Sequence, residues 1–442
     1  MEFLPTSDHR MIKHIVELVP DKLYWASVDI NLYSIYLKSN GVRSVEKPVM
    51  KTCVPLNLLS KSRESEAVCE GSENVDFNIS PRKTKRMCVK NNLRINLPRI
   101  VYTDKVFVYR PLGKDFGPLD LPTTYRYIDF LDDLFLSVSV VLHVCDYRKS
   151  SLCSNSAYLA SVYSVVRFGV TSAEIGSKLA AVSSILPYRD ASMNPRNTFP
   201  LTIQDCCLAI VLSREHGWFD WDNFDVNAAE HYQDIDNGDL NWIFENKFLA
   251  FAGPSSDCLD EDGLDVHPPC HYLPIFEQFG ITDIVRLNVS NYQGSEFEGI
   301  NHHDLYFPDG SCPPKSVVDD FLRISQSTDS SVAVHCKAGL GRSACMIGIW
   351  AIAQYRITAH TFIAWARIAR PGSVLGPQQH FLVEIQNSLC YGGNGSRKSN
   401  SRILCSQGSA SPMGVHGDRG QGSRLLKQKR QQTRIPRTLP FA

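Results

Sequence analysis

The chain has 442 residues. This length predicts more than one domain, because a single hydrophobic core usually stops growing near about 250 to 300 residues. Hydrophobic residues make up 43% and charged residues 21%, a composition that excludes a wholly disordered, collagen-like or coiled-coil chain. The 46 basic and 46 acidic residues cancel overall, but ten basic residues and the single acid Asp418 lie in residues 391–442, so the rest of the chain is acidic.

Membrane and disulfide signals are absent from the sequence. No apolar run reaches the length of about 18 residues that a membrane helix needs, and the first 22 residues interleave charges where a signal peptide would be apolar. The 14 cysteines form no C-x-x-C pair, which is typical of reduced thiols and not of a disulfide framework. We therefore expect a soluble intracellular protein that makes no membrane contact.

Segments typical of strands alternate with segments typical of helices along the chain, and this alternation predicts an α/β fold. We expect a first domain over residues 1–200 and a second over residues 201–390. Residues of about 40–104 show neither a strand period nor a helix period, so we interpret them as an irregular insertion into the first domain.

Two stretches of the sequence resemble one another. SVVLHVCDYRKSS at 139–151 precedes a helical run near 156–168, and SVAVHCKAGLGRS at 331–343 precedes a helical run near 343–355. In both, a β-branched strand delivers a His and a Cys into a loop, and an amphipathic helix follows. The pattern predicts a duplicated domain whose first copy has lost the glycines and carries Ser151 where the second copy has an arginine.

LYFPDGSCPP at 305–314 contains turn-forming Pro and Gly residues and predicts a loop. Asp309 lies in this loop, 27 residues before Cys336. It is a candidate general acid, since that role needs a carboxyl group on a loop beside the reacting group. A plain turn-forming Asp-Gly is the alternative.

The motif HCKAGLGRS at 335–343 lies between a predicted buried strand and a predicted helix. Such a turn directs successive backbone N–H groups to one point above the helix N-terminus, and that point binds a phosphate dianion. Its glycines let the backbone curl, and its arginine offers a planar fork for two phosphate oxygens. The candidate phosphate-binding residues are Lys337, Ala338, Gly339, Leu340, Gly341 and Arg342.

Cys336 stands at the centre of this anion cradle. The cradle should lower its pKa from about 8.5 into the range of about 3.5 to 7.5, and the thiolate can then attack phosphorus to give a cysteinyl phosphate. Ser343 can hydrogen-bond the sulfur as it leaves, and the adjacent amides of Gln378 and Gln379 can position the water of the second step. A buried inert thiol is the alternative, and it fits Cys345 better than Cys336.

Residues 391–442 are rich in Gly, Ser, Gln and basic residues and lack apolar periodicity. This composition predicts a disordered basic tail. KQKR at 427–430 is a candidate nuclear-import or polyanion-binding patch, with a merely solvated tail as the alternative.

Taken together, these motifs resemble the cell division cycle 14 group of dual-specificity protein phosphatases, within the cysteine-dependent protein tyrosine phosphatase superfamily. The resemblance runs to about residue 386, outside the insertion and the tail, and is carried by DKLYWASV, FGPLDLPTTYRY, PYRDAS, FDWDNFDV, EHYQDIDNGDLNWI, FLAFAGP, DLYFPDGS, AVHCKAGLGRS and IAWARIARPGSVLGPQQHFL. It implies two tandem phosphatase-like α/β domains, the first without a working catalytic loop, followed by a disordered basic tail.

The same resemblance implies the roles of the site residues. Cys336 is then the nucleophile, Arg342 the phosphate binder and Asp309 the general acid, and Gln378 and Gln379 manage water in the hydrolytic step. Cysteine phosphatases need no metal, and no stretch of the sequence has structural-zinc spacing, so we expect neither a metal nor a cofactor.

The resemblance also implies the substrates: phosphotyrosine and, above all, phosphoserine or phosphothreonine before proline with a basic residue downstream. Such an enzyme opposes cyclin-dependent kinases in cell-cycle control. The basic residue would bind an acidic groove between the domains, with a solvated acidic face as the alternative. The candidate groove residues are Glu230, Asp234, Asp236 and Asp239. Asn227, Ala228 and Gln233 stand where relatives carry acids, which predicts a weaker basic preference.

A non-enzyme alternative remains: a phosphate-reading scaffold whose turnover is weakened by Ala344, which replaces a glycine familiar in the group. The expected partners are phosphorylated substrates of proline-directed kinases. Nucleic acid is not expected because the body is acidic, and homodimerisation is left open. We expect the protein in the nucleus and cytoplasm, with the nucleolus, spindle and centrosome as further candidate locations.

Overall fold

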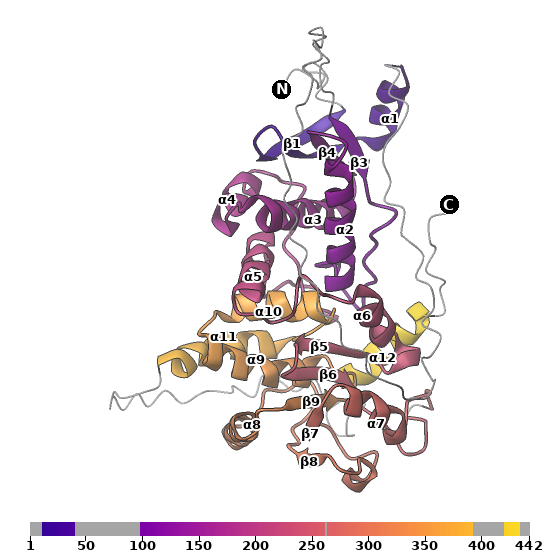
Figure 1. The fold of residues 1–442 in the computed structure, drawn as a ribbon, viewed down its shortest axis with the longest axis vertical. Coiled ribbons are helices and arrows are strands. Elements are labelled where there is room, and N and C mark those ends of the chain that lie inside the picture. Colours follow the sequence, from indigo (N-terminus) through magenta and orange to yellow (C-terminus); the bar gives the residue numbers. More distant parts are fainter. Residues whose placement is uncertain (1–10, 40–97, 261–262, 392–419, 434–442) are drawn as a thin grey trace, which may run out of the picture.

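The computed structural model describes residues 11–39, 98–260, 263–391 and 420–433, which form two sheets with helices between and around them (Figure 1). The strands are β1 (Ile12–Val19), β2 (Leu23–Val28), β3 (Arg99–Tyr102), β4 (Val141–Asp146), β5 (Leu240–Phe244), β6 (Phe248–Ala252), β7 (Ile281–Arg286), β8 (Asn301–Asp304) and β9 (Ser331–Cys336). The α-helices are α1 (Ile30–Ser39), α2 (Leu121–Phe135), α3 (Ser150–Phe168), α4 (Ser172–Leu179), α5 (Ile203–Glu215), α6 (Val226–Gln233), α7 (Pro269–Gln278), α8 (Lys315–Ser327), α9 (Gly341–Tyr355), α10 (Ala359–Ala369), α11 (Pro377–Tyr391) and α12 (Gln421–Thr433). Two short 3₁₀ turns are η1 (Ile235–Asn237) and η2 (Gly294–Glu296).

The two sheets share one plan. The first has the order β1-β2-β4-β3 and the second the order β5-β6-β9-β7-β8. Each begins with an antiparallel hairpin, β1–β2 or β5–β6, whose second strand pairs in parallel with a fully buried central strand, β4 or β9. A largely buried helix, α3 or α9, follows each central strand. The structure therefore confirms the predicted pair of α/β units.

Two predicted irregular segments contain regular structure where the structure describes them. β3 lies inside the insertion expected at about 40–104 and pairs in parallel with β4, so the expectation of no strand there is wrong at its C-terminal end. Residues 40–97 lie outside the described part of the chain. In the basic tail, residues 421–433 form α12, while residues 392–419 and 434–442 lie outside the described part.

The strand register shows that the expected alignment of Cys145 with Cys336 is wrong by one residue. Asp146 pairs with Val28 at the end of β4, just as Cys336 pairs with Ala252 at the end of β9. Asp146 therefore holds the position that Cys336 holds in the second unit, and Cys145 is one residue too early and buried in the core. The Asp146 carboxylate accepts two hydrogen bonds from the Arg148 guanidinium, at 2.9 and 3.0 Å. A carboxylate at this position would repel a phosphate.

The two units are joined through helices. α5 packs against α3 of the first unit and α10 of the second, and one apolar cluster extends from Trp25 in the first sheet to Trp350 beyond the second. Burying one large apolar side chain in this cluster stabilises the fold by about 2 to 3 kcal/mol. The Trp365 indole of α10 also donates a 2.7 Å hydrogen bond to the Ile243 carbonyl of β5. This shared core fixes the first unit against the second. Among the described helices, none has the length and apolar character to cross a membrane.

Two histidines, His143 and His335, are fully buried in the folded chain. Burial lowers the pKa of His143 and of His335 to about 3. His143 lies within hydrogen-bond distance of the Thr103 and Tyr127 hydroxyls, at 2.8 and 2.9 Å. Below pH 6.5 the unfolded chain binds protons that the folded chain does not, so stability falls as the pH drops from about 6.5 towards 3.

We therefore expect acid to destabilise the protein through these groups. Each histidine should contribute about 1.4 kcal/mol per pH unit to the slope of unfolding free energy against pH between pH 6 and 4.5. Urea unfolding of His143→Gln should show a slope smaller by about that amount, and the exposed His231→Gln should keep the full slope. An unchanged slope in His143→Gln would contradict the burial argument.

Candidate active site

The predicted phosphate loop connects the end of β9 to the start of α9. Gly339 has φ +64°, and a Cβ there would lie 2.0 Å from the Phe251 carbonyl oxygen, so only glycine fits. α9 begins at Gly341, its N-cap is Leu340, and no side chain caps it, which leaves its first N–H groups facing the loop. Cys336 is 3% exposed at the base of this loop.

Arg342 is fully buried in the first turn of α9. Its Nη1 donates to the carbonyl oxygens of Leu287 and Phe307, at 3.2 and 3.0 Å. These two carbonyls belong to the segments after β7 and β8, so the guanidinium is held from outside its own helix. That support orients the planar fork towards the loop.

Asp309 lies in the loop between β8 and α8, as predicted. Its side chain is 11% exposed, and Oδ1 is 3.5 Å from the Arg342 Nη2. The structure therefore brings the predicted acid to the predicted phosphate binder, although 33 positions of sequence separate them. Oδ2 accepts a 2.7 Å hydrogen bond from the Gly422 N–H of α12.

The two predicted glutamines occupy different surroundings at the start of α11. Gln378 lies against the loop, since a Cβ on Gly341 would be 3.0 Å from its Oε1, and its Nε2 donates to the Ser311 carbonyl at 3.0 Å. Gln379 accepts a hydrogen bond from the Arg367 guanidinium at 2.5 Å. Gln378 is thus the amide beside the loop, and the Gln379 amide is engaged by Arg367 and the Gly376 carbonyl.

Ser343 is fully buried in α9 next to the loop, and no described group hydrogen-bonds its hydroxyl. The buried neighbours Ala344 and Cys345 belong to the apolar core. Ser343 therefore stays a prediction as the partner of the Cys336 sulfur.

A buried hydrogen-bond chain behind the cysteine was not predicted from the sequence. His335 Nδ1 is 3.2 Å from the Cys336 carbonyl, which can only accept, so Nδ1 carries the proton of the neutral ring. Nε2 then accepts from the Tyr292 hydroxyl at 2.6 Å, and His302 Nε2 lies 2.8 Å from the same hydroxyl. This chain of hydrogen bonds holds the backbone at Cys336.

Arg370 is a second support that the sequence did not reveal. The fully buried guanidinium donates to the carbonyl oxygens of Gly339 and Ala338, at 2.8 and 3.1 Å. It also donates to Asn241 at 2.6 Å and pairs with Asp239 at 3.0 Å. By holding two loop carbonyls away from the loop interior, Arg370 leaves the N–H groups to face an anion.

The four predicted groove acids do not act as one group. Asp239 is buried and reaches the loop through Arg370. Glu230 instead makes two 2.7 Å hydrogen bonds to Arg126 of α2, and Asp234 accepts from the Asp236 backbone N–H. Of the four, Asp239 is therefore the one that lies at the predicted phosphate loop.

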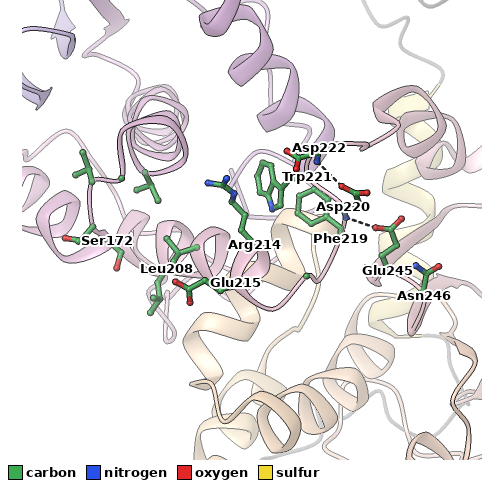
Figure 2. A pocket seen from close by; sticks show the side chains of 16 residues that line it. Ser172, Leu208, Arg214, Glu215, Phe219, Asp220, Trp221, Asp222, Glu245 and Asn246 are labelled. Atoms are coloured by element: carbon green, nitrogen blue, oxygen red, sulfur yellow. Dashed lines mark hydrogen bonds between the residues drawn. The ribbon is translucent and has the colours of Figure 1, made fainter. Parts of the chain in front are cut away.

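A separate cavity of about 870 Å³ lies where the end of α3, the start of α4 and α5 meet the loop after α5 (Figure 2). The Arg214 guanidinium lies over the Trp221 ring, 5.9 Å from its centroid. None of the predicted catalytic, phosphate-binding or groove residues lines this cavity. Nor do three or more His, Cys, Asp or Glu side chains gather as metal ligands anywhere in the described ranges.

A buried cysteine ending the central parallel strand, a glycine loop and a buried arginine opening the next helix define the class of cysteine-dependent phosphatase domains. Two family models match: "Dual specificity protein phosphatase, N-terminal half" over residues 87–212, and "Polymorphic toxin system, DSP-PTPase phosphatase" over residues 271–355. The chain belongs to the CDC14 family of dual-specificity phosphatases.

Individual relatives show how far this likeness extends. Dual specificity protein phosphatase CDC14A of Homo sapiens is 42% identical over 316 residues, which cover 69% of this chain and 52% of the relative. CDC14AB of Danio rerio is 43% identical over 305 residues, covering 67% and 49%. The crystal structure of Tk-PTP in the active form has 18% identity and a TM-score of 0.28, covering 34% of this chain and 96% of that one. The chain spans about half the length of the curated relatives it matches.

Proposed function

We propose that the protein is a dual-specificity phosphatase that removes phosphate from serine, threonine and tyrosine side chains of other proteins. The convergence of three predicted groups carries this proposal. Cys336 ends β9, Arg342 opens α9, and Asp309 reaches the guanidinium of Arg342 from the loop after β8, at 3.5 Å. A nucleophile, a phosphate binder and an acid thus meet at one loop of backbone N–H groups.

The reaction would proceed in two displacements. The Cys336 thiolate attacks phosphorus while Asp309 gives a proton to the departing side-chain oxygen, leaving a phosphate ester on sulfur. Water then attacks that phosphorus, Asp309 takes its proton, and the thiolate leaves with inorganic phosphate as the product. Gln378, which lies beside Gly341, would orient this water, and Arg342 would hold two phosphate oxygens throughout.

The proposed preference for a basic residue after a Ser-Pro site rests chiefly on Asp239. Glu230 is already paired with Arg126, and Gln233 and Asn241 form a neutral hydrogen-bonded pair nearby, at 3.0 Å. With one of the predicted groove acids at the loop instead of several, the preference for a basic residue should be modest. We also propose, from family membership, that the protein opposes proline-directed kinases in cell-cycle control and acts in the nucleus as well as the cytoplasm.

Peptide hydrolysis tests this function. A phosphoserine-proline peptide with lysine three residues after the serine should be hydrolysed about tenfold faster in kcat/KM than the same peptide with alanine, a difference of ~1.4 kcal/mol. Asp239→Asn should remove most of that difference, and Asp236→Asn, which changes an exposed acid nearby, should keep it. Phosphothreonine and phosphotyrosine peptides measure the dual specificity. Binding of all the peptides without turnover would instead support the weakened scaffold.

A further inference from the structure

α12 lies across the catalytic loop, close to η1 and the ends of β5 and β6 (Figure 1). The Gly422 N–H donates to Asp309 Oδ2 at 2.7 Å. A Cβ on Gly422 would lie 2.9 Å from Lys337 Cβ, so the backbone of this turn rests directly on the loop. The first turn of α12 thus touches both the predicted acid and the loop that holds Cys336.

The apolar face of α12 closes the seam between the two units. Leu425 and Leu426 are 1% and 2% exposed and belong to one buried cluster with residues of both units. That cluster includes Ala338 and Leu340 of the catalytic loop and Leu112 of the first unit. A helix whose two leucines fit between these surfaces covers the space through which a peptide would reach the loop.

Polar contacts anchor the helix along its length. Arg424 donates to the Leu112 and Ala191 carbonyls of the first unit, at 2.8 and 2.7 Å. Further along the helix, the Lys429 ammonium pairs with Asp239 at 2.6 Å. α12 therefore places a cation on the acid that the proposed function assigns to the basic residue of a substrate.

We propose that α12 is an intramolecular inhibitor that occupies the substrate site of its own chain. In the docked state Asp309 Oδ2 is engaged by Gly422 and Oδ1 faces Arg342, so neither oxygen is turned to a leaving group. The Lys429 part of this inference rests on the proposed function, because it treats Asp239 as the subsite for a basic residue. Occlusion of the loop by Gly422, Leu425 and Leu426 does not depend on it.

Release of α12 would open the site. The apparent affinity of an occluded site is lowered by the fraction of molecules that are open. Because inhibitor and site share one chain, docking benefits from an effective concentration on the order of millimolar. A peptide of the same sequence added in solution should therefore inhibit only at comparable concentrations.

The test uses the full chain and two kinds of α12 variant. Leu425→Ser with Leu426→Ser removes the apolar anchor, and Lys429→Ala removes the ion pair. Lys427→Ala is the matched control, because Lys427 has the same charge on the same helix but is exposed. Thermal unfolding checks that each variant keeps its fold.

Two readouts are measured on each protein. The first is the rate at which iodoacetamide alkylates Cys336, followed by mass mapping, which needs no enzymatic activity. The second is kcat/KM for the phosphoserine-proline-lysine peptide. Both should rise by about tenfold in the leucine variant, as expected if the open fraction grows from roughly a tenth to nearly all. Lys429→Ala should raise both less, and Lys427→Ala should leave both unchanged.

A synthetic peptide spanning residues 420–433 should slow Cys336 alkylation in the leucine variant again at about millimolar concentration. Unchanged or slower alkylation in the leucine variant, with unchanged or lower kcat/KM, would overturn the inference and show that α12 braces the site. If alkylation accelerates and no protein hydrolyses the peptide, the occlusion stands and the proposed phosphatase function fails.

Discussion

Replacing Cys336 with serine should reduce phosphopeptide turnover by on the order of 10⁴ to 10⁶-fold, the loss expected when a covalent nucleophile is removed. The serine hydroxyl is not ionised at neutral pH, so it cannot attack phosphorus as the thiolate does. Arg342 and the loop N–H groups remain in place, so phosphopeptide affinity should stay within a few-fold of the wild type. Steady-state kinetics and fluorescence polarisation measure the two quantities.

Cys270 provides the matched control for this substitution. It is exposed on α7, away from the loop, and Cys270→Ser should keep full activity. Residual turnover in Cys336→Ser within about a hundredfold of the wild type would contradict the assigned nucleophile, because general acid and electrostatic effects alone would then account for the rate.

Replacing Arg342 with lysine should lower kcat/KM for a phosphopeptide by about 10³-fold, since one arginine that holds a transferring phosphoryl group is worth about that much. Lysine keeps the positive charge but cannot hold two phosphate oxygens in one plane. It also cannot donate from one fork to the Leu287 and Phe307 carbonyls while facing Asp309. Both substrate affinity and kcat should fall.

Stability must be measured beside activity, because Arg342 is fully buried. The substitution leaves the buried carbonyls of Leu287 and Phe307 without their donor, which should lower the free energy of unfolding by about 1 to 3 kcal/mol. The protein should therefore stay folded at 25 °C. Arg323→Lys on α8 changes an exposed arginine and should leave kcat/KM unchanged. A kcat/KM within tenfold of the wild type in Arg342→Lys would exclude the proposed phosphate-binding role.

Much of the site could be predicted because its key residues are adjacent in the chain. Cys336 through Ser343 form one loop and the first turn of one helix, so their spacing alone specifies an anion cradle. Asp309 could be predicted from the turn chemistry of its own segment. The alternating strand and helix segments likewise predicted two α/β units, because each unit contains its own hairpin, central strand and buried helix.

The residues that hold the loop in place could not be predicted from the sequence, since they come from segments that are distant along the chain. Arg370 holds Gly339 across 31 positions of sequence, and Tyr292 contacts His335 across 43. The pair of Glu230 and Arg126 likewise joins residues 104 positions apart. No local pattern specifies such pairs.

Register and burial explain the remaining differences. Cys145 was expected in the place of Cys336, but that place depends on the pairing of β4 with β2, where a shift of one residue brings Asp146 there. α12 was expected as part of a disordered tail because its composition is basic and polar. Leu425 and Leu426 give it a packed face only in the presence of Leu112, Ala338 and Leu340.

Trapping is the decisive test for a cysteinyl phosphate on Cys336. The enzyme is mixed with a phosphopeptide carrying labelled phosphate, quenched in acid within one turnover, and digested for mass mapping. We expect labelled phosphate on the peptide that contains Cys336 in the wild type, more of it in Gln378→Ala, and none in Cys336→Ser. Label on a different residue would rule out the cysteinyl phosphate. Peptide hydrolysis by the wild type and by Gln378→Ala without any protein-bound phosphate would rule it out as well.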